Sequence, residues 1–169
     1  KVIELMGYPW AKDLIHVPFG MVSYEGQTLS TRKGNIVYLD ELLERAIEKA
    51  GEIIAQKNPE LANKDTVARQ VGVGAVLFYD LYNSRIKDVD FWWDRALAFE
   101  GETGPYVQYT HARACSVLAK SGVSAQEALN NEQWDPEALC NPEAQEVLSL
   151  LEGFPQAVHN ACAKNEPCV

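Results

Sequence analysis

Cysteine is scarce in this chain, and its spacing excludes the common uses of clustered cysteines. The 169 residues contain four, namely Cys115, Cys140, Cys162 and Cys168. No two of them form a Cys-x-x-Cys pair, and no histidine stands at a zinc-ligand spacing from them. We therefore expect reduced thiols and no metal site.

Long apolar runs are also missing. No stretch approaches the roughly 20 apolar residues that a membrane-spanning helix needs, and no charged-then-apolar leader opens the chain. The chain begins at Lys1 without a methionine, which suggests a piece of a longer protein. From the sequence we expect a soluble, cytoplasmic protein without a membrane partner.

Positive charge is in short supply. Fifteen Lys and Arg face 24 Asp and Glu, a net charge of −9. Between residues 100 and 169 the count is ten acidic against three basic, a net of −7. This balance argues against a protein that binds DNA or RNA by neutralising many phosphates at once. Any RNA bound by the downstream half must be held through a few stacked and hydrogen-bonded bases.

Familiar catalytic signatures are absent as well. The sequence has no Gly-x-Ser-x-Gly, no Walker-type phosphate loop, no defensible pair of catalytic carboxylates, no internal repeat and no low-complexity tract.

What the chain does contain is helical periodicity. Apolar residues recur at i, i+3, i+4 and i+7 over 39–56 and 65–84, which predicts two long helices. Gly72 and Gly74 cost stability in the second one, which indicates close packing against a neighbour. Other patterns predict a helix tail at 1–6, strands over 14–17 and 21–24, and an extended segment at 88–94 whose Phe91, Trp92 and Trp93 anchor the core. Further helices are expected over 105–120, 124–130, 142–151 and 154–162, with Gly153 and Pro155 separating the last two.

The loop from Gly26 to Asn35 is the one locally basic, glycine-flanked segment. Its glycines let backbone N–H groups approach a ligand, and its hydroxyls, Arg32 and Lys33 suit an anion such as a triphosphate. A cationic loop of this kind stabilises the charge that builds on a leaving pyrophosphate. The alternative is a polar hairpin with two solvated cations.

The helix that starts at Pro105 and ends before Gly122 has two stripes. Tyr106, Tyr109 and Arg113 share one with Val117, and such rings and guanidinium planes stack on unpaired bases at about 1–3 kcal/mol per base. The other stripe is aliphatic and is expected to pack in the core: Val107, Ala114 and Leu118. Alternatively, the tyrosines bury their rings and the arginine is a solvated charge.

The order of residues 101–113, Gly-Glu-Thr-Gly-Pro-Tyr-Val-Gln-Tyr-Thr-His-Ala-Arg, closely resembles the start of the anticodon-binding domain of arginyl-tRNA synthetases. Ser30 to Gly34 resembles that family's version of the Lys-Met-Ser-Lys-Ser signature of class I synthetases. The signature's lysines fall on Thr28 and Thr31, and Lys33 could supply the missing charge. HVPFGMV, residues 16–22, resembles the family's strand beside the adenine of ATP.

The resemblance implies roles for these residues. Ser30, Arg32 and Lys33 become the activation-loop candidates, and His16 and Gly20, with Ser30 and Lys33, the ATP contacts. Tyr106, Tyr109 and Arg113 become candidates for contacts to the anticodon of tRNA(Arg). The full-length enzyme would activate L-arginine with ATP and Mg²⁺ and transfer it to that tRNA. The motifs for the first half of the nucleotide site lie upstream in the family, so this portion alone should be inactive.

The expected fold is mainly α with a small α/β portion. The resemblance implies the edge of a Rossmann-type catalytic domain at 1–37, a helical connector at 38–98, and the truncated start of an α-helical anticodon-binding bundle at 99–169. A non-catalytic helical module that binds RNA or docks a protein is the alternative. A structural helical domain without an RNA partner is a third possibility.

Overall fold

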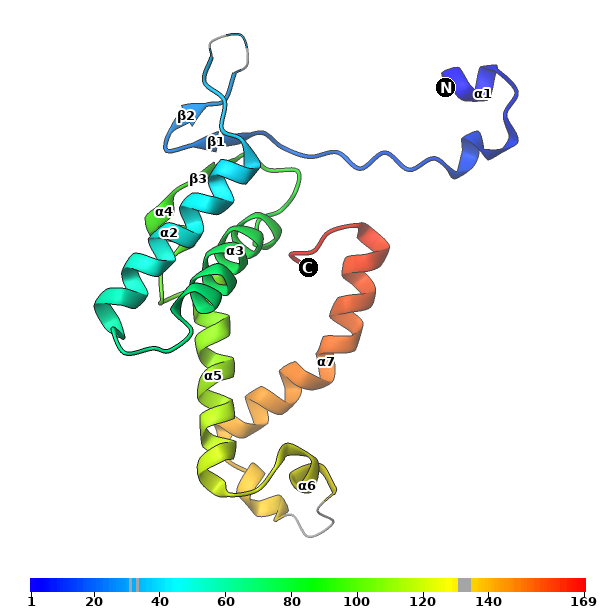
Figure 1. The fold of residues 1–169 in the computed structure, drawn as a ribbon. Coiled ribbons are helices and arrows are strands. Elements are labelled where there is room, and N and C mark those ends of the chain that lie inside the picture. Colours follow the sequence, from blue (N-terminus) through cyan, green and yellow to red (C-terminus); the bar gives the residue numbers. More distant parts are fainter. Residues whose placement is uncertain (31, 33, 131–134) are drawn as a thin grey trace.

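The computed structural model describes residues 1–30, 32, 34–130 and 135–169. Most of these residues are helical, and one small sheet lies beside them (Figure 1). The expected mainly helical fold with a small α/β portion is confirmed.

The N-terminal segment extends away from the rest of the chain (Figure 1). Helix α1 (Val2–Leu5) agrees with the expected helix tail, and a 3-10 turn, η1 (Pro9–Asp13), follows it. The strand expected over 14–17 is wrong, because this stretch is exposed and has no ladder partner among the described residues. Its short apolar run favours an extended backbone, but a strand also requires a neighbour to accept and donate its hydrogen bonds.

Three short strands form the sheet in the order β2-β1-β3. Strand β1 (Val22–Tyr24), which confirms the second predicted strand, pairs antiparallel with β2 (Gln27–Thr28) and parallel with β3 (Val89–Phe91). Glu25 and Gly26 both have positive φ, 48° and 76°, as a tight two-residue hairpin turn requires. The parallel pairing places the 20–24 segment beside residues far along the chain.

The two long helices, α2 (Leu39–Lys57) and α3 (Lys64–Tyr82), confirm the periodicity argument and make the most extensive helix contact. Small residues form the centre of their interface, with Ala46, Ala50 and Ala68 buried, and larger aliphatic side chains such as Ile47 and Val71 pack around them. A Cβ on Gly72 would lie 2.6 Å from the carbonyl oxygen of Ala46, closer than real Cβ atoms approach. The glycine therefore lets the backbones meet, as the sequence indicated.

The core prediction for the aromatic segment is correct for two of its three residues. Phe91 and Trp93 are buried and pack on Tyr24 and Tyr79. Trp92 is 37% exposed, so its expected core role is wrong. Side chains alternate across a strand, which sends residues 91 and 93 to the helices and residue 92 to the opposite side. The short helix α4 (Trp93–Ala96) follows.

Helix α5 (Gly104–Ser121) has the predicted ends. The Tyr106 N–H donates to the Thr103 hydroxyl at 3.2 Å, and Gly122 closes the helix with φ 72°. Gly104 and Pro105 are buried against α3 and the Gln108 amide donates to the Gln70 carbonyl at 3.0 Å, but the helix beyond these first turns projects away (Figure 1). The expected core packing of Val107, Ala114 and Leu118 is therefore wrong: all three are exposed.

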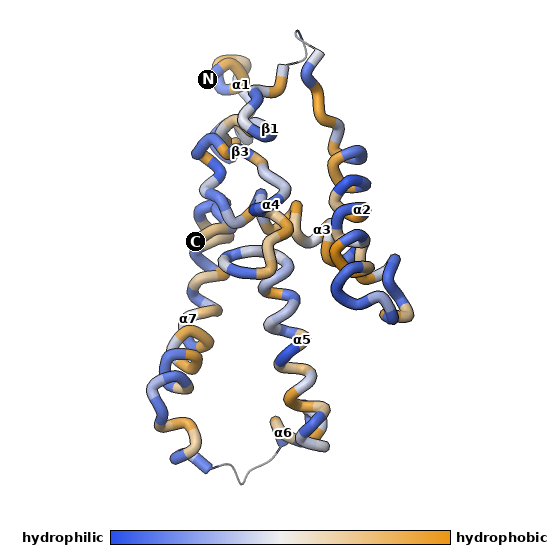
Figure 2. Tube along the Cα trace, turned by 90° about the vertical axis from the view of Figure 1, so that its left-hand side faces the viewer, coloured by the Kyte–Doolittle hydropathy of each residue, from blue (hydrophilic) through white to orange (hydrophobic). Residues whose placement is uncertain are grey.

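The last elements are α6 (Ala125–Asn130), a 3-10 turn η3 (Pro136–Leu139) and α7 (Pro142–Lys164). The break expected at Gly153 and Pro155 is wrong, because α7 continues through both and bends near its middle (Figure 1). Proline already has a helical φ. The carbonyl of Leu151 that loses its N–H partner lies in an exposed turn, where water can replace the bond. Apolar positions recur along α7 without a covering layer (Figure 2).

The glycine contact between α2 and α3 predicts an asymmetric response to alanine. Gly72→Ala should lower the free energy of unfolding by roughly 1–3 kcal/mol, because the new methyl overlaps the α2 backbone. Gly153→Ala in α7 is the matched control, since no atom lies within 4 Å of its added Cβ, and it should raise helix stability by up to about 1 kcal/mol. Urea unfolding followed by circular dichroism measures both, and equal effects would contradict the packing argument.

Candidate functional site

The hairpin that contains Ser30 and Arg32 continues the β1–β2 pair. Ser30 and Asn35 exchange backbone hydrogen bonds of 2.8 and 3.1 Å, and the Asn35 side chain donates to the Thr28 carbonyl at 3.2 Å. Ser30 and Arg32 lie around the same hollow of about 450 Å³. Lys33, the third candidate of this loop, lies outside the described residues, as does Thr31.

Asp90 on β3 holds the base of this hairpin. One carboxylate oxygen accepts hydrogen bonds from the Gly26 N–H at 3.0 Å and the Ser23 hydroxyl at 2.8 Å. The other accepts from the Trp92 indole N–H at 2.6 Å. These donors, with the Gly26 N–H foremost, hold the pKa of Asp90 below its ordinary value. The sequence analysis missed this residue, although the Asp-x-Trp spacing in a segment expected to be extended was a usable signal, because it places the two side chains on the same side.

His16 and Gly20 are not brought to the hairpin hollow. His16 is exposed on the extended N-terminal segment. Gly20 lies against the chain after α3: its N–H donates to the Arg85 carbonyl at 2.6 Å, and an added Cβ would lie 2.2 Å from the Lys87 carbonyl oxygen. The missing side chain at position 20 is thus explained by backbone contact, whatever else the segment binds.

The aromatic stripe of α5 is accessible to solvent. Tyr106 and Tyr109 are 44% and 50% exposed, and the Arg113 guanidinium lies 5.7 Å from the centroid of the Tyr109 ring. Neither the rings nor the cation is sealed in a core, so flat surfaces are available for stacking. The helix presents these groups well away from the hairpin (Figure 1).

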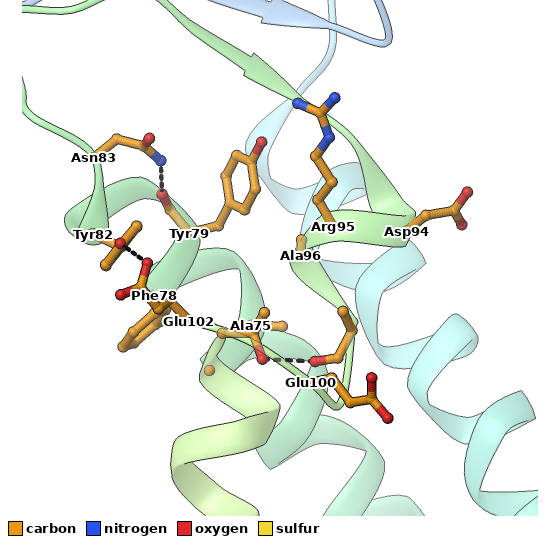
Figure 3. Close-up of a pocket in the computed structure, with 13 residues that line it drawn as sticks. Ala75, Phe78, Tyr79, Tyr82, Asn83, Asp94, Arg95, Ala96, Glu100 and Glu102 are labelled. Atoms are coloured by element: carbon orange, nitrogen blue, oxygen red, sulfur yellow. Dashed lines mark hydrogen bonds between the residues drawn. The ribbon is translucent and has the colours of Figure 1, made fainter.

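The turn before α5 is fixed by side chains. The Tyr82 hydroxyl donates to the Glu102 carboxylate (Figure 3). The Thr103 hydroxyl donates to the Ala98 carbonyl at 2.6 Å. The Glu102 contact raises the pKa of Tyr82. A hollow of about 410 Å³ opens beside the turn, with the carboxylates Asp94, Glu100 and Glu102 and one cation, Arg95, around it. The excess of negative charge makes the hollow unsuited to a phosphate.

A larger groove, of about 1190 Å³, runs between α3 and the first half of α5. Valines and Leu77 line much of it, and Arg69, Tyr109 and His111 add polar and aromatic groups. The described lining includes no carboxylate, in a chain with net charge −9. The α3 side of this groove was missed by the sequence analysis, because helical periodicity identifies α3 but not its distance from α5.

The described ranges contain neither a metal-binding cluster nor a helix able to cross a membrane. The four cysteines are free and exposed, and no described group of three His, Cys, Asp or Glu side chains could hold a metal ion. Of the helices the structure describes, none combines the length and apolar character that crossing a membrane demands.

Family comparisons divide the chain into two matched parts. Residues 1–93 match the family described as tRNA synthetases class I (R), catalytic domain, and residues 107–169 match the DALR anticodon binding domain. The first match covers more than half of the chain and defines the class, a class I tRNA synthetase. Within that class, the chain belongs to the arginyl-tRNA synthetase family.

Individual relatives are similar over nearly the whole chain. The arginine-tRNA ligase of Clostridioides difficile is 54% identical over 167 residues, and that of Alkaliphilus metalliredigens 51% over 169, covering 99% and 100% of this chain. In both cases the chain spans 29% of the relative's length.

Solved structures show the same similarity. The arginyl-tRNA synthetase of Thermus thermophilus aligns with a TM-score of 0.78 and 37% identity, over 98% of this chain and 26% of that one. The Plasmodium falciparum enzyme shares the fold, with a TM-score of 0.73 at 23% identity over 96% of this chain and 27% of that one.

The contacts of Asp90 predict a titration that NMR can follow. The Trp92 indole N–H resonance should shift with a midpoint below the ordinary aspartate pKa, because the folded state favours the charged carboxylate. The contacts should therefore stabilise the hairpin above the ordinary aspartate pKa and be lost as pH falls through the lowered one. Asp90→Asn should abolish the shift, whereas Asp88→Asn, which removes the charge of the nearby carboxylate that accepts the Met21 N–H, should preserve it. An unchanged titration in Asp90→Asn would refute the assignment.

Proposed function

We propose that the full-length protein containing this chain attaches L-arginine to tRNA(Arg), using ATP to form arginyl adenylate before transfer. The observation that carries the proposal is the presence of two separate surfaces in one chain. A hairpin with Ser30 and Arg32 lies in the part that matches the catalytic domain, and an exposed Tyr-Tyr-Arg stripe lies at the junction with the anticodon-domain match. We assign 1–37 to the catalytic edge, 38–98 to a connector and 99–169 to the anticodon-binding part.

In this proposal the hairpin acts on the phosphates of ATP. Attack on the α-phosphorus releases pyrophosphate, and its growing negative charge is stabilised by the Ser30 hydroxyl and the Arg32 guanidinium, with Lys33 as a further cation. The Asp90 contacts hold the hairpin base, so the loop closes from a fixed position. Mg²⁺ would arrive with ATP, held largely by phosphates and water. His16 and Gly20 stay candidates for the strand beside adenine.

The α5 stripe is proposed to contact the anticodon. Tyr106 and Tyr109 offer exposed rings for unstacked bases, and Arg113 adds a planar cation over one of them. This mode suits the downstream half, whose net charge of −7 cannot attract RNA by general electrostatics. Recognition through a few bases also favours selectivity for the RNA sequence over high affinity.

The activation loop can be tested by arginine-dependent exchange between ATP and pyrophosphate in the full-length protein. Arg32→Ala should reduce the rate on the order of 10²-fold, because a preorganised contact to the leaving group is lost. Lys12→Ala removes a cation from the exposed η1 turn and should leave the rate unchanged. A normal rate in Arg32→Ala would show that its charge is incidental, and the alternative of a non-catalytic module predicts no exchange at all.

The RNA assignment is tested by filter binding of tRNA(Arg) to the full-length protein. Tyr109→Ala and Arg113→Ala should each weaken binding by about 1–3 kcal/mol, the value of one lost stacking contact. Val117→Ala, on the same stripe but without a ring or charge, is the matched control and should bind normally. Unchanged affinity in both test variants would remove the anticodon assignment and favour a structural helical domain.

A further inference from the structure

Arg85 stands at the point where three distant segments meet. Its side chain donates to the Pro18 carbonyl through Nη1 at 2.6 Å, to the Asn165 carbonyl through Nε at 2.7 Å, and to the Lys164 carbonyl through Nη2 at 3.3 Å. Only 25% of the side chain is exposed. The planar guanidinium carries five fixed N–H donors, which is why one arginine can hold several acceptors on different segments.

Glu166 adds the charge partner. Its Oε2 lies 3.2 Å from the Arg85 Nε, and its Oε1 accepts the Arg85 backbone N–H at 3.0 Å. Among the residues that the structure describes, this is the only ion pair. The Cys168 thiol, the Arg85 N–H and the nearby guanidinium together hold the pKa of Glu166 below its ordinary value. Arg85 therefore binds the C-terminal end of α7 through both its backbone N–H and its side chain.

These contacts of Arg85 matter because few others hold α7 in place. No residue of the helix is buried. Asn165 ends it with a positive φ of 50°, and the carbonyls that Arg85 binds lie at this end, where the helix dipole is negative and favours a cation. Figure 1 shows the C-terminal end of α7 returning toward α3 while its first turn lies far away.

The opposite side of Arg85 holds the HVPFG segment, residues 16–20. Pro18 binds the guanidinium, and the Gly20 N–H donates to the Arg85 carbonyl at 2.6 Å. Residue 85 thus contacts this segment twice, next to the first residues of the β1–β3 pairing. The buried core of α2 and α3 does not include Arg85, so the contact adds positioning to a fold already held elsewhere.

We propose that Arg85 is a positioning residue that fixes the HVPFG segment against the C-terminal end of α7, and so holds the segment in its ATP-binding position with help from the helical domain. This inference rests on the proposed function, in which that segment lies beside the adenine. Arg85 acts through Pro18 and Gly20 and does not touch the nucleotide.

Hydrogen-deuterium exchange of the full-length protein tests the contact itself. Arg85→Met should speed amide exchange in peptides covering 14–20 and 158–169, while peptides from α2 and α3 keep their protection. Glu166→Gln should affect the C-terminal peptides more than the N-terminal ones. Arg95→Met is the matched control, since Arg95 lies over Trp92 and contacts neither segment. Unchanged exchange in both segments of Arg85→Met would overturn the proposal.

Kinetics separate positioning from a merely structural role. In arginine-dependent pyrophosphate exchange, Arg85→Met should raise the KM for ATP about tenfold with a smaller change in kcat, because misplacement weakens binding more than chemistry. Glu166→Gln should raise this KM less. The double variant should be no worse than Arg85→Met alone, because both changes break one contact.

If the KM increases of the two single variants multiply in the double variant, the positioning role is overturned. A normal KM for ATP in Arg85→Met despite faster amide exchange in the 14–20 peptides would also overturn it. Failure of the proposed function has a different signature, because the wild-type full-length protein would then show no arginine-dependent exchange at all.

Arg85→Lys supplies a folded intermediate case: one ammonium keeps the charge beside Glu166 but cannot reach Pro18 and both α7 carbonyls together. Compared with Arg85→Met, Arg85→Lys should restore amide protection at 158–169 more fully than at 14–20. Equal restoration in the two segments would contradict the proposed contacts of Arg85.

Discussion

The close approach of backbones along α3 is the constraint on which the rest of the structure depends. Gly72 allows α2 to cross α3 at the Ala46 carbonyl, and Gly104 lets the first turn of α5 meet α3 at Gly74 and Ala75. Such contacts offer little side-chain area but many dispersion contacts between main-chain atoms. The described core is correspondingly small, made of alanines with a few larger residues from β3 and α4. The hairpin and the α5 stripe, which are proposed to bind ligands, are attached at the edges of this core.

This arrangement explains why the two surfaces proposed to bind ligands, the hairpin and the α5 stripe, are exposed and far apart. The hairpin is joined to the core through β1, β3 and the Asp90 carboxylate, and α5 through one buried turn. Each surface is therefore positioned by a few polar or main-chain contacts, which suits loops and helices that meet large ligands. Arg85 lies where such contacts from both halves converge, between the catalytic-domain match and the last residues of the anticodon-domain match.

Local sequence signals predicted most elements correctly. The helices α2, α3 and α5 followed from apolar spacing, Pro105 and Gly122, because these signals act within one or two turns of backbone. The errors share a cause in the surroundings. Among the described residues, the 14–17 segment has no pairing partner and no layer covers the aliphatic stripe of α5, while Pro155 lies in a solvated turn that tolerates a lost hydrogen bond.

The candidate site divides in the same way. Residue types and their order alone indicated the cationic hairpin, the Tyr106, Tyr109 and Arg113 stripe and the family, because motifs encode chemistry locally. Tertiary structure alone decided that Asp90 supports the hairpin, that Arg69 faces the α5 groove, and that Arg85 meets residues 18 and 164–166. The Asp90 and Arg85 contacts join residues 64 to 81 positions apart in the chain, so they exist only once packing has chosen which segments become neighbours.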